Sequence, residues 1–248
     1  LDPASEVLPL LGAKEGLAHL ALAVLDEGAV SLAADPGYPV YTGGPLIAGA
    51  QAASLPLTPA TGFQPDLDAV PADLAERARL LVCGYPNNPI GAVAAPDLFE
   101  RLAAFGDRHD LVLCHDHAYA EIAYDDAQAP SALAHPGFRA RGIEILSLSK
   151  TFSVPGWRIA FAVGDPEIVA TLRRLKTQID SGMFPALQRT AAWMLRQDDL
   201  DGPPVAVYRA RRDLACARLA EIGLPVDPPA GGMYLWVPVP VGAKIGRA

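Results

Sequence analysis

Short apolar runs alternate along the chain with segments whose apolar residues recur at helical spacing. The runs at 29–34, 79–84, 110–114 and 143–148 are too short for helices and are rich in branched residues. They predict buried strands. Segments between them, such as 96–108, gather leucine and phenylalanine on one face and predict amphipathic helices. Strands that alternate with helices predict an α/β fold, with a mostly parallel sheet covered by helices on both faces.

The pattern changes towards the carboxyl end. An acidic stretch with Gly and Pro, 198–204, interrupts the helical periodicity there. It is the predicted boundary between a large domain, 1–200, and part of a smaller α+β domain, 201–248. Around it the sequence predicts helices from Asp165, at 185–196 and up to about Ile222, followed by a strand at 232–237.

The stretch between Asp35 and Asp66 carries no charged residue. Prolines and glycines interrupt it, so a helix of about 20 residues that could span a membrane is not expected. We interpret this stretch as buried loop, helix and strand, and no signal peptide is evident.

Composition narrows the class of function. The 248 residues are 51% hydrophobic with a net charge of −8, which provides for a large core and argues against nucleic acid as a partner. Cys83 and Cys114 lie in strand-like runs without CxxC spacing, as expected for buried thiols in a reducing cytoplasm. The chain starts at Leu1 and stops at Ala248 just after a strand-like run, which we interpret as a fragment without its amino-terminal segment.

Polar side chains follow three of the predicted strands. Asn88, Asp116 and Lys150 each come directly after an apolar run. Because the carboxyl ends of parallel strands meet at one edge of a sheet, these groups are expected to converge on a ligand site. A lysine at such a place is paired, neutral or covalently engaged, unless it simply extends to water as an ordinary strand-end lysine.

An anion site is predicted beside it. Gly12 lets the backbone turn before a helix, so the amides of Ala13 and Lys14 point out of the helix start, where a negative charge is stabilised. The Ser147 and Ser149 hydroxyls and the Arg158 guanidinium would suit a phosphate next to the Lys150 amine.

Tyr38 lies between Pro36 and Pro39, which fix the backbone around it. The ring is suited to serve as a stacking platform, and the alternative is a tyrosine of the core.

A metal site is not expected. His115 and His117 flank Asp116, but on a strand the two imidazoles share one face and the carboxylate takes the other. Three ligands therefore do not converge from this stretch.

The motifs together resemble the class I/II aminotransferases of fold type I, which use pyridoxal phosphate (PLP), and most of all their LL-diaminopimelate aminotransferase branch. The resemblance covers residues 1–239 and rests on the motifs Gly12-Ala13-Lys14, Pro36-Gly37-Tyr38-Pro39, Asn87-Asn88-Pro89-Ile90-Gly91, Asp116-His117-Ala118-Tyr119, Ser147-Leu148-Ser149-Lys150 and Gly156-Trp157-Arg158. It implies a large PLP domain followed by a smaller α+β domain.

The resemblance also implies roles. Lys150 would form the aldimine with PLP and shuttle a proton, and Asp116 would keep the pyridine nitrogen protonated. Asn88 and Tyr119 would contact the ring O3′, and Tyr38 would stack on the ring. The catalytic residues would be Lys150, Asp116 and Tyr119. The phosphate would be held by Ala13, Lys14, Ser147 and Arg158.

Two positions depart from the family pattern. Ile90 stands where a threonine is usual, and His117 stands where a small residue is usual, which predicts an imidazole near the cofactor ring. The arginine that binds the substrate carboxylate in the family is expected beyond Ala248, and Arg247 lacks the surroundings for that role.

The resemblance implies an amino acid, such as LL-diaminopimelate, and a 2-oxo acid, such as 2-oxoglutarate, as substrates of a cytoplasmic homodimer. The apolar stretch 36–65 and the segment 181–184 are the predicted contact surfaces. Two alternatives are a PLP-dependent C–S lyase of the same fold and a truncated, non-catalytic relative.

Overall fold

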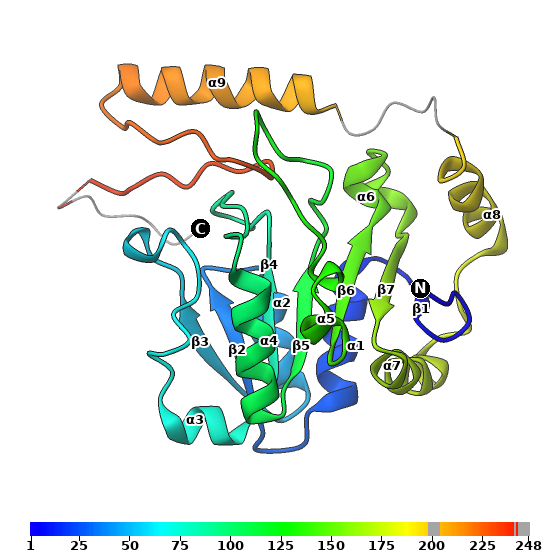
Figure 1. Ribbon diagram of the computed structural model, residues 1–248. Coiled ribbons are helices and arrows are strands. Elements are labelled where there is room, and N and C mark those ends of the chain that lie inside the picture. The colour runs from blue at the N-terminus through cyan, green and yellow to red at the C-terminus, as the bar shows by residue number, and fades with distance from the viewer. Residues whose placement is uncertain (198–203, 241, 243–248) are drawn as a thin grey trace.

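A computed structural model describes residues 1–197, 204–240 and 242, and its centre is a seven-stranded sheet (Figure 1). The order across the sheet is β1-β7-β6-β5-β4-β2-β3. The strands are β1 (Val7–Leu10), β2 (Val30–Asp35), β3 (Gln51–Pro56), β4 (Ala78–Gly84), β5 (Val112–Asp116), β6 (Gly142–Ser147) and β7 (Ala160–Gly164).

The middle of the sheet is parallel and one side is antiparallel. Strands β3, β2, β4, β5 and β6 pair in parallel, whereas β7 is antiparallel to β6 and β1 is antiparallel to β7. The predicted mostly parallel sheet is therefore confirmed. The inner strands β2 and β4 are buried on both faces, as the largely apolar runs at 29–34 and 79–84 indicate.

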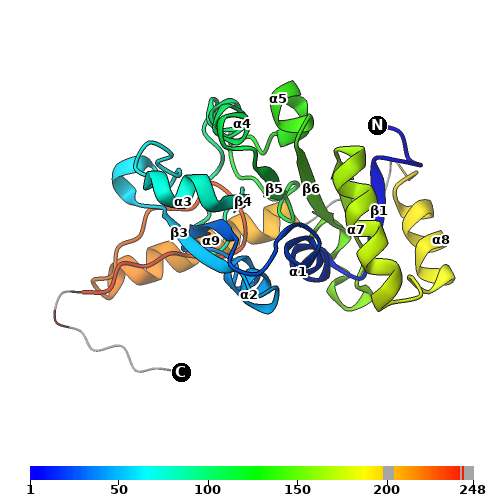
Figure 2. The ribbon, with the colours of Figure 1, turned by 90° about the horizontal axis from the view of Figure 1, so that it is seen from below.

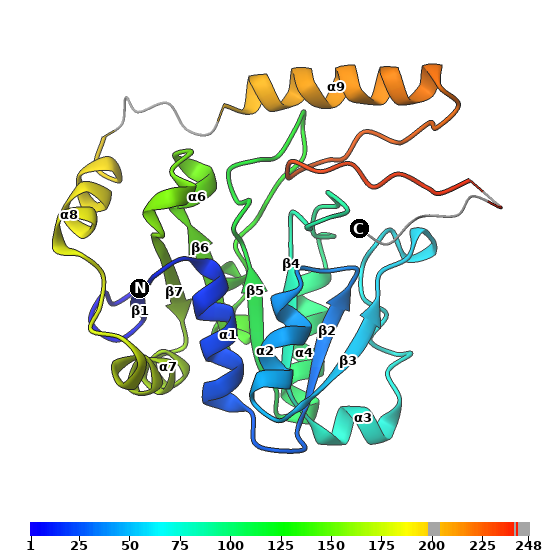
Figure 3. The same cartoon turned by 180° about the vertical axis from the view of Figure 1, so that it is seen from behind.

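Helices cover both faces (Figures 2 and 3). One core lies under α3, α4 and α5, and the other under α1, α2 and α7. The helices are α1 (Ala13–Val24), α2 (Val40–Ile47), α3 (Ala72–Arg77), α4 (Leu98–His109), α5 (Pro136–Arg139), α6 (Leu148–Thr151), α7 (Pro166–Ile179), α8 (Pro185–Met194) and α9 (Val205–Glu221), with short 3₁₀ turns η1 (Pro59–Thr61), η2 (Ala132–Ala134) and η3 (Pro155–Trp157).

Strand alternation assigns each side chain of β5 to one core. Leu113 belongs to the core under α4, and the ring of His115 packs edge-on against Phe99 of that core. Cys114 belongs to the core under α1. The next residue of that parity, Asp116, reaches the opposite layer from His115 and His117.

The carboxyl-terminal region differs from the prediction in one respect. The run at 232–237 is not a strand. An isolated β-bridge joins Gly231, just before the run, to Ala123, and it does not continue into the run. Without a neighbouring strand the run has no ladder of hydrogen bonds. It follows the loops at the carboxyl edge of the sheet, where α9 also lies (Figure 1).

The predicted domain boundary, at 200/201 within 198–204, falls on residues 198–203, which lie outside the described residues. Within the described ranges, no helix has both the length and the apolar character needed to cross a membrane.

A test of the packing uses Leu102, which is fully buried where α4 meets the sheet. Leu102→Ala is expected to lower the free energy of unfolding by about 2–5 kcal/mol, because the lost side chain leaves a cavity in a close-packed layer. Urea unfolding followed by circular dichroism measures the change. Leu214 on α9 is 60% exposed, so Leu214→Ala should shift the free energy by no more than about 0.5 kcal/mol. Equal midpoints for the two variants would contradict this packing.

Candidate active site

All nine cofactor-binding residues that the sequence predicts line one cavity at the carboxyl edge of the sheet. They come from the start of α1, from the loops after β2 and β4, from the end of β5 with the loop after it, and from the end of β6 with the segment after it. The remaining lining residues are Ser149, whose hydroxyl the sequence also predicts near the anion, and three that sequence reasoning gave no role: Ala118, Pro155 and Tyr234.

One end of the cavity is rich in donors. Gly12 caps α1 with φ +98°, a conformation that side chains rarely adopt, and the Arg158 guanidinium lies against it where a Cβ would be. The first turn of α1 therefore directs its free N–H groups towards the same space as Arg158. Lys14 Nζ lies 5.5 Å from the centre of the Tyr38 ring. This end fits an anion.

A half-buried ion-pair cluster holds the start of α1. The Glu15 carboxylate accepts the Leu11 N–H at 2.8 Å, and Lys176 Nζ of α7 contacts Glu15 at 2.9 Å and Asp180 at 2.6 Å. Burial lowers the pKa of Lys176, but its two carboxylate partners outweigh that effect and raise it overall. The lysine stays charged and ties α7 to the turn that presents the anion site.

Lys150 lies in α6, one short turn after β6. Ser147 caps that turn by accepting the Ser149 N–H at 3.2 Å. Lys150 Nζ lies 5.9 Å from the centre of the Tyr119 ring. Among residues 1–197, 204–240 and 242, no carboxylate oxygen lies within 4.0 Å of Lys150 Nζ, the limit for an ion pair. The amine is therefore available for chemistry.

Asp116 is a buried carboxylate at the end of β5. Tyr41 of α2 donates its hydroxyl to Oδ2 at 2.9 Å, and the Ala118 N–H donates to Oδ1 at 3.3 Å. Burial raises the pKa of Asp116, while these hydrogen bonds and nearby His117 oppose the rise. Gly84 of β4 leaves the room that the Tyr41 hydroxyl occupies. Sequence reasoning missed Tyr41, which lies 75 residues away from Asp116 along the chain.

The rest of the cavity is lined by aromatic side chains and by one amide side chain, that of Asn88. Burial raises the pKa of Tyr119, and the neighbouring Tyr234 hydroxyl adds to the rise, so Tyr119 is a neutral donor at physiological pH. The two rings meet edge to face with centres 6.3 Å apart. Tyr234 belongs to the run at 232–237, and it lines the cavity as a loop residue.

The two asparagines of the 87–91 turn have different tasks. Asn88 lines the cavity. Asn87 is buried and closes the turn, since its side chain donates to the Gly84 carbonyl and accepts the Ile90 N–H, both at 3.2 Å. Ile90 is buried as well, which accounts for an apolar residue at that position.

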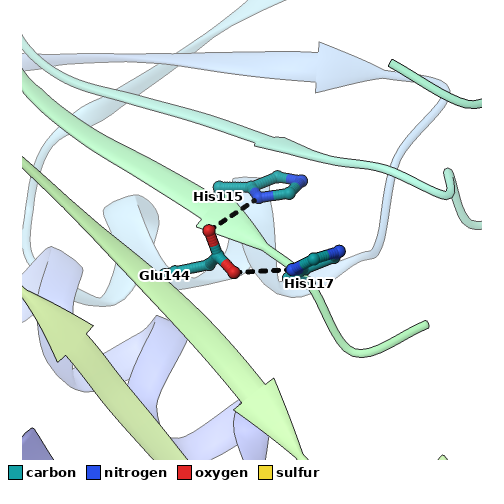
Figure 4. A group of neighbouring side chains, drawn as sticks. All are labelled: His115, His117 and Glu144. Atoms are coloured by element: carbon teal, nitrogen blue, oxygen red, sulfur yellow. Dashed lines mark hydrogen bonds and ion pairs between the residues drawn. The ribbon is translucent and has the colours of Figure 1, made fainter. Parts of the chain in front are cut away.

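The prediction that His117 places an imidazole near the cofactor ring is wrong. His117 does not line the cavity. Its Nδ1 lies 2.6 Å from Glu144 on the other face of the sheet (Figure 4), because neighbouring residues of a strand point to opposite faces. Asp116 and the two histidines do not converge, as predicted. Glu144 of β6 joins His115 and His117 instead, and sequence reasoning did not single it out.

Comparison with known proteins agrees with the fold and the motifs. The chain matches the model of the family "Aminotransferase class I and II" over residues 1–242. It is 45% identical over 244 residues to the LL-diaminopimelate aminotransferase of Moorella thermoacetica, covering 98% of this chain and 62% of that relative. It is 43% identical over 243 residues to LL-diaminopimelate aminotransferase 2 of Trichormus variabilis, with the same 98% and 62% coverage.

Solved structures show the same fold. Substrate-bound BacF from Bacillus subtilis superposes with a TM-score of 0.93 at 34% identity, over 98% of this chain and 62% of that one. A probable N-succinyldiaminopimelate aminotransferase from Thermus thermophilus gives 0.88 at 36% identity, over 98% and 65%. The chain thus spans less than two thirds of the length of these relatives. The predicted fold is confirmed, and the chain belongs to the aminotransferase class I and II family.

Proposed function

We propose that the protein is a PLP-dependent aminotransferase that moves an amino group from an amino acid to a 2-oxo acid. One observation carries the proposal: an amine without an ion-pair partner in the described part of the chain, Lys150, shares a cavity with a buried carboxylate, Asp116, and with an anion site at the start of α1. PLP has the matching set of groups, namely an aldehyde, a pyridine nitrogen and a phosphate.

The residues present fit this cofactor. The N–H groups of Ala13 and Lys14, the Ser147 hydroxyl and the Arg158 guanidinium would hold its phosphate by charge-assisted hydrogen bonds. When bound, PLP supplies an electron sink for the carbanion formed at the substrate α-carbon. On the ring, Tyr38 would stack, and Asn88 and Tyr119 would donate to O3′.

Asp116 sets the charge of the ring. Its carboxylate is held by Tyr41 and by the Ala118 N–H, so it cannot rotate freely. A buried carboxylate without a cationic partner is costly, as its raised pKa indicates. A protonated pyridine nitrogen would remove that cost, and Asp116 would in turn keep the proton on the nitrogen.

Lys150 moves the proton. Its Nζ would take a proton from the substrate α-carbon as a general base and return it as a general acid. Tyr119 and Tyr234 line that side of the cavity with aromatic surface.

For the substrate we propose LL-diaminopimelate or a related amino acid, with 2-oxoglutarate as the partner. The names of the relatives and the motif resemblance support this choice. A dicarboxylate partner requires a cation beyond Lys14 and Arg158, which are assigned to the phosphate.

We also propose a cytoplasmic homodimer. Free, buried thiols at Cys83 and Cys114 fit a reducing compartment. Apolar side chains on α2 and before α8 support a second copy as partner, since Leu46 is 66% exposed, Ile47 71% and Phe184 67%.

The cofactor linkage is tested with Lys150→Ala. The purified wild-type protein is expected to take up PLP, absorb visible light and lose that colour on borohydride reduction, with PLP then fixed to Lys150 in a peptide map. The variant should bind PLP without a reducible linkage and lose at least about 10²–10⁴ in activity, because its general base is gone. A wild-type protein that takes up no PLP contradicts the assignment.

Asp116→Ala is the matched control for that experiment. It should keep the reducible linkage and lose activity on the order of 10²-fold, because the charge that holds the ring nitrogen protonated is missing.

The substrate is tested with a panel of amino donors and 2-oxoglutarate, followed as glutamate formation on protein with its natural termini. Diaminopimelate is expected to give glutamate. Glutamate from aspartate or apolar donors alone would contradict the substrate and leave transamination intact. Pyruvate released from cystathionine without an acceptor would identify a C–S lyase instead.

The homodimer is tested by sedimentation at micromolar concentration. Twice the chain mass is expected, and Ile47→Asp should shift the protein towards monomer by burying a charge at the contact. A monomeric wild-type protein would contradict the dimer.

A further inference from the structure

A buried carboxylate lies beneath the site, on the face of the sheet opposite to the Asp116 side chain. Glu144 of β6 is the register partner of His115 of β5. The two imidazoles of β5 both face it: His117 Nδ1 lies 2.6 Å from Oε1, and His115 Nδ1 lies 3.5 Å from Oε2 (Figure 4). All three side chains are almost completely buried. We call this group, with Ser131, the Glu144 network.

Glu144 is ionised and its two oxygens are fully engaged. Burial raises the pKa of its carboxyl, but the His115 and His117 imidazoles that face it outweigh burial and hold the pKa below its usual range. Oε2 also accepts the Ser131 hydroxyl at 2.9 Å and the Ala132 N–H at 2.8 Å. Removing this carboxylate would therefore leave several buried donors without an acceptor.

His115 contacts the Tyr85 backbone through one ring nitrogen and faces Glu144 with the other. Its Nε2 lies 3.2 Å from the Tyr85 backbone nitrogen and 3.1 Å from the Tyr85 carbonyl oxygen, and its Nδ1 lies 3.5 Å from Glu144 Oε2. Burial lowers the pKa of His115, in keeping with a neutral ring.

Both histidines connect Glu144 to segments that carry the site. His115 Nε2 contacts the Tyr85 backbone, and Tyr85 opens the turn that presents Asn88. His117 lies between Asp116 and Ala118, and its backbone N–H donates to the Ile145 carbonyl at 3.0 Å. The same short stretch leads to Tyr119.

We propose that the Glu144 network is a positioning device, which fixes the carboxyl ends of β4 and β5 so that Asn88, Asp116 and Tyr119 are preset for the cofactor ring. The ring contacts in this statement rest on the proposed function, whereas the anchoring of the two strand ends does not. The roles of Glu144, His115 and His117 are thus exerted through other residues.

A metal ion is the competing occupant of these side chains, whose possible ligand atoms lie within 4.8 Å of one another. The geometry argues against it. Ligand atoms at about 2.1 Å from a tetrahedral ion lie roughly 3.4 Å apart, whereas His117 Nδ1 and Glu144 Oε1 are 2.6 Å apart. Ser131 and Ala132 also occupy Oε2.

The test compares Glu144→Gln, His115→Asn and His117→Asn with the wild type, using hydrogen exchange of the cofactor-free protein and equilibrium binding of PLP. Glu144→Gln keeps the shape and loses the charge. Exchange should rise about tenfold or more in both 85–91 and 116–122. The histidine variants separate the two arms: His115→Asn should affect 85–91 and His117→Asn should affect 116–122. Each variant should raise the Kd for PLP, with Glu144→Gln raising it about tenfold.

Leu102→Ala is the control for general loss of stability, since Leu102 lies in the same core and its apolar side chain takes no part in the hydrogen bonds of the network. It should lower the unfolding midpoint and leave the Kd for PLP unchanged. Exchange at 85–91 and 116–122 should rise no more than exchange in the rest of the sheet. If Glu144→Gln behaves like Leu102→Ala, the network only stabilises the core and the proposal fails. The histidine variants decide the same question if Glu144→Gln does not fold.

Two further outcomes are distinguishable. Stoichiometric zinc retained by wild type after dialysis against Zn²⁺, and lost in Glu144→Gln, would overturn the positioning role in favour of a metal site. A wild-type protein that binds no PLP would refute the proposed function, while the exchange pattern would still decide whether the network anchors the strand ends.

Discussion

A buried carboxylate is stable only where donors or cations surround it, and this structure meets that requirement at two places at one edge of its sheet. Asp116 and Glu144 lie on neighbouring strands and face opposite layers. Asp116 accepts a hydrogen bond from Tyr41 of α2. Glu144 is contacted by two imidazoles and by the Ala132 N–H at the start of η2. Helix α2 on one face and the turn η2 on the other are thus tied to the sheet by polar contacts, next to the cavity that carries the proposed chemistry.

The sequence predicted the groups that follow strands, because strand ends are marked by local pattern. Asn88, Asp116 and Lys150 could be located from apolar runs alone, and Gly12 from the helix that follows it. Tyr41, Glu144 and Tyr234 could not be found in this way. Tyr41 lies 75 positions from its partner Asp116, and Glu144 lies 27 positions from its partner His117. Tyr234 is more than a hundred positions from its partner Tyr119. The local periodicity of the sequence does not record such contacts.

Side-chain direction was the second limit. The family resemblance predicts an imidazole near the cofactor ring at His117, whereas strand alternation turns His117 to the face opposite Asp116. The strand expected at 232–237 shows a related limit: a strand needs a partner for its backbone, and apolar composition says nothing about whether one lies alongside.

The alternation at the end of β5 has a consequence for how this region tolerates change. A one-residue slip of the strand, by insertion, deletion or mispairing, would exchange its two faces. The Asp116 carboxylate would then turn towards Glu144, and an imidazole would take the place that now accepts the Tyr41 hydroxyl. Two buried carboxylates facing each other would repel strongly. The correct alignment of β5 is thus enforced by charge as well as by shape, and viable length variation in this part of the chain is confined to the loops on either side of the strand.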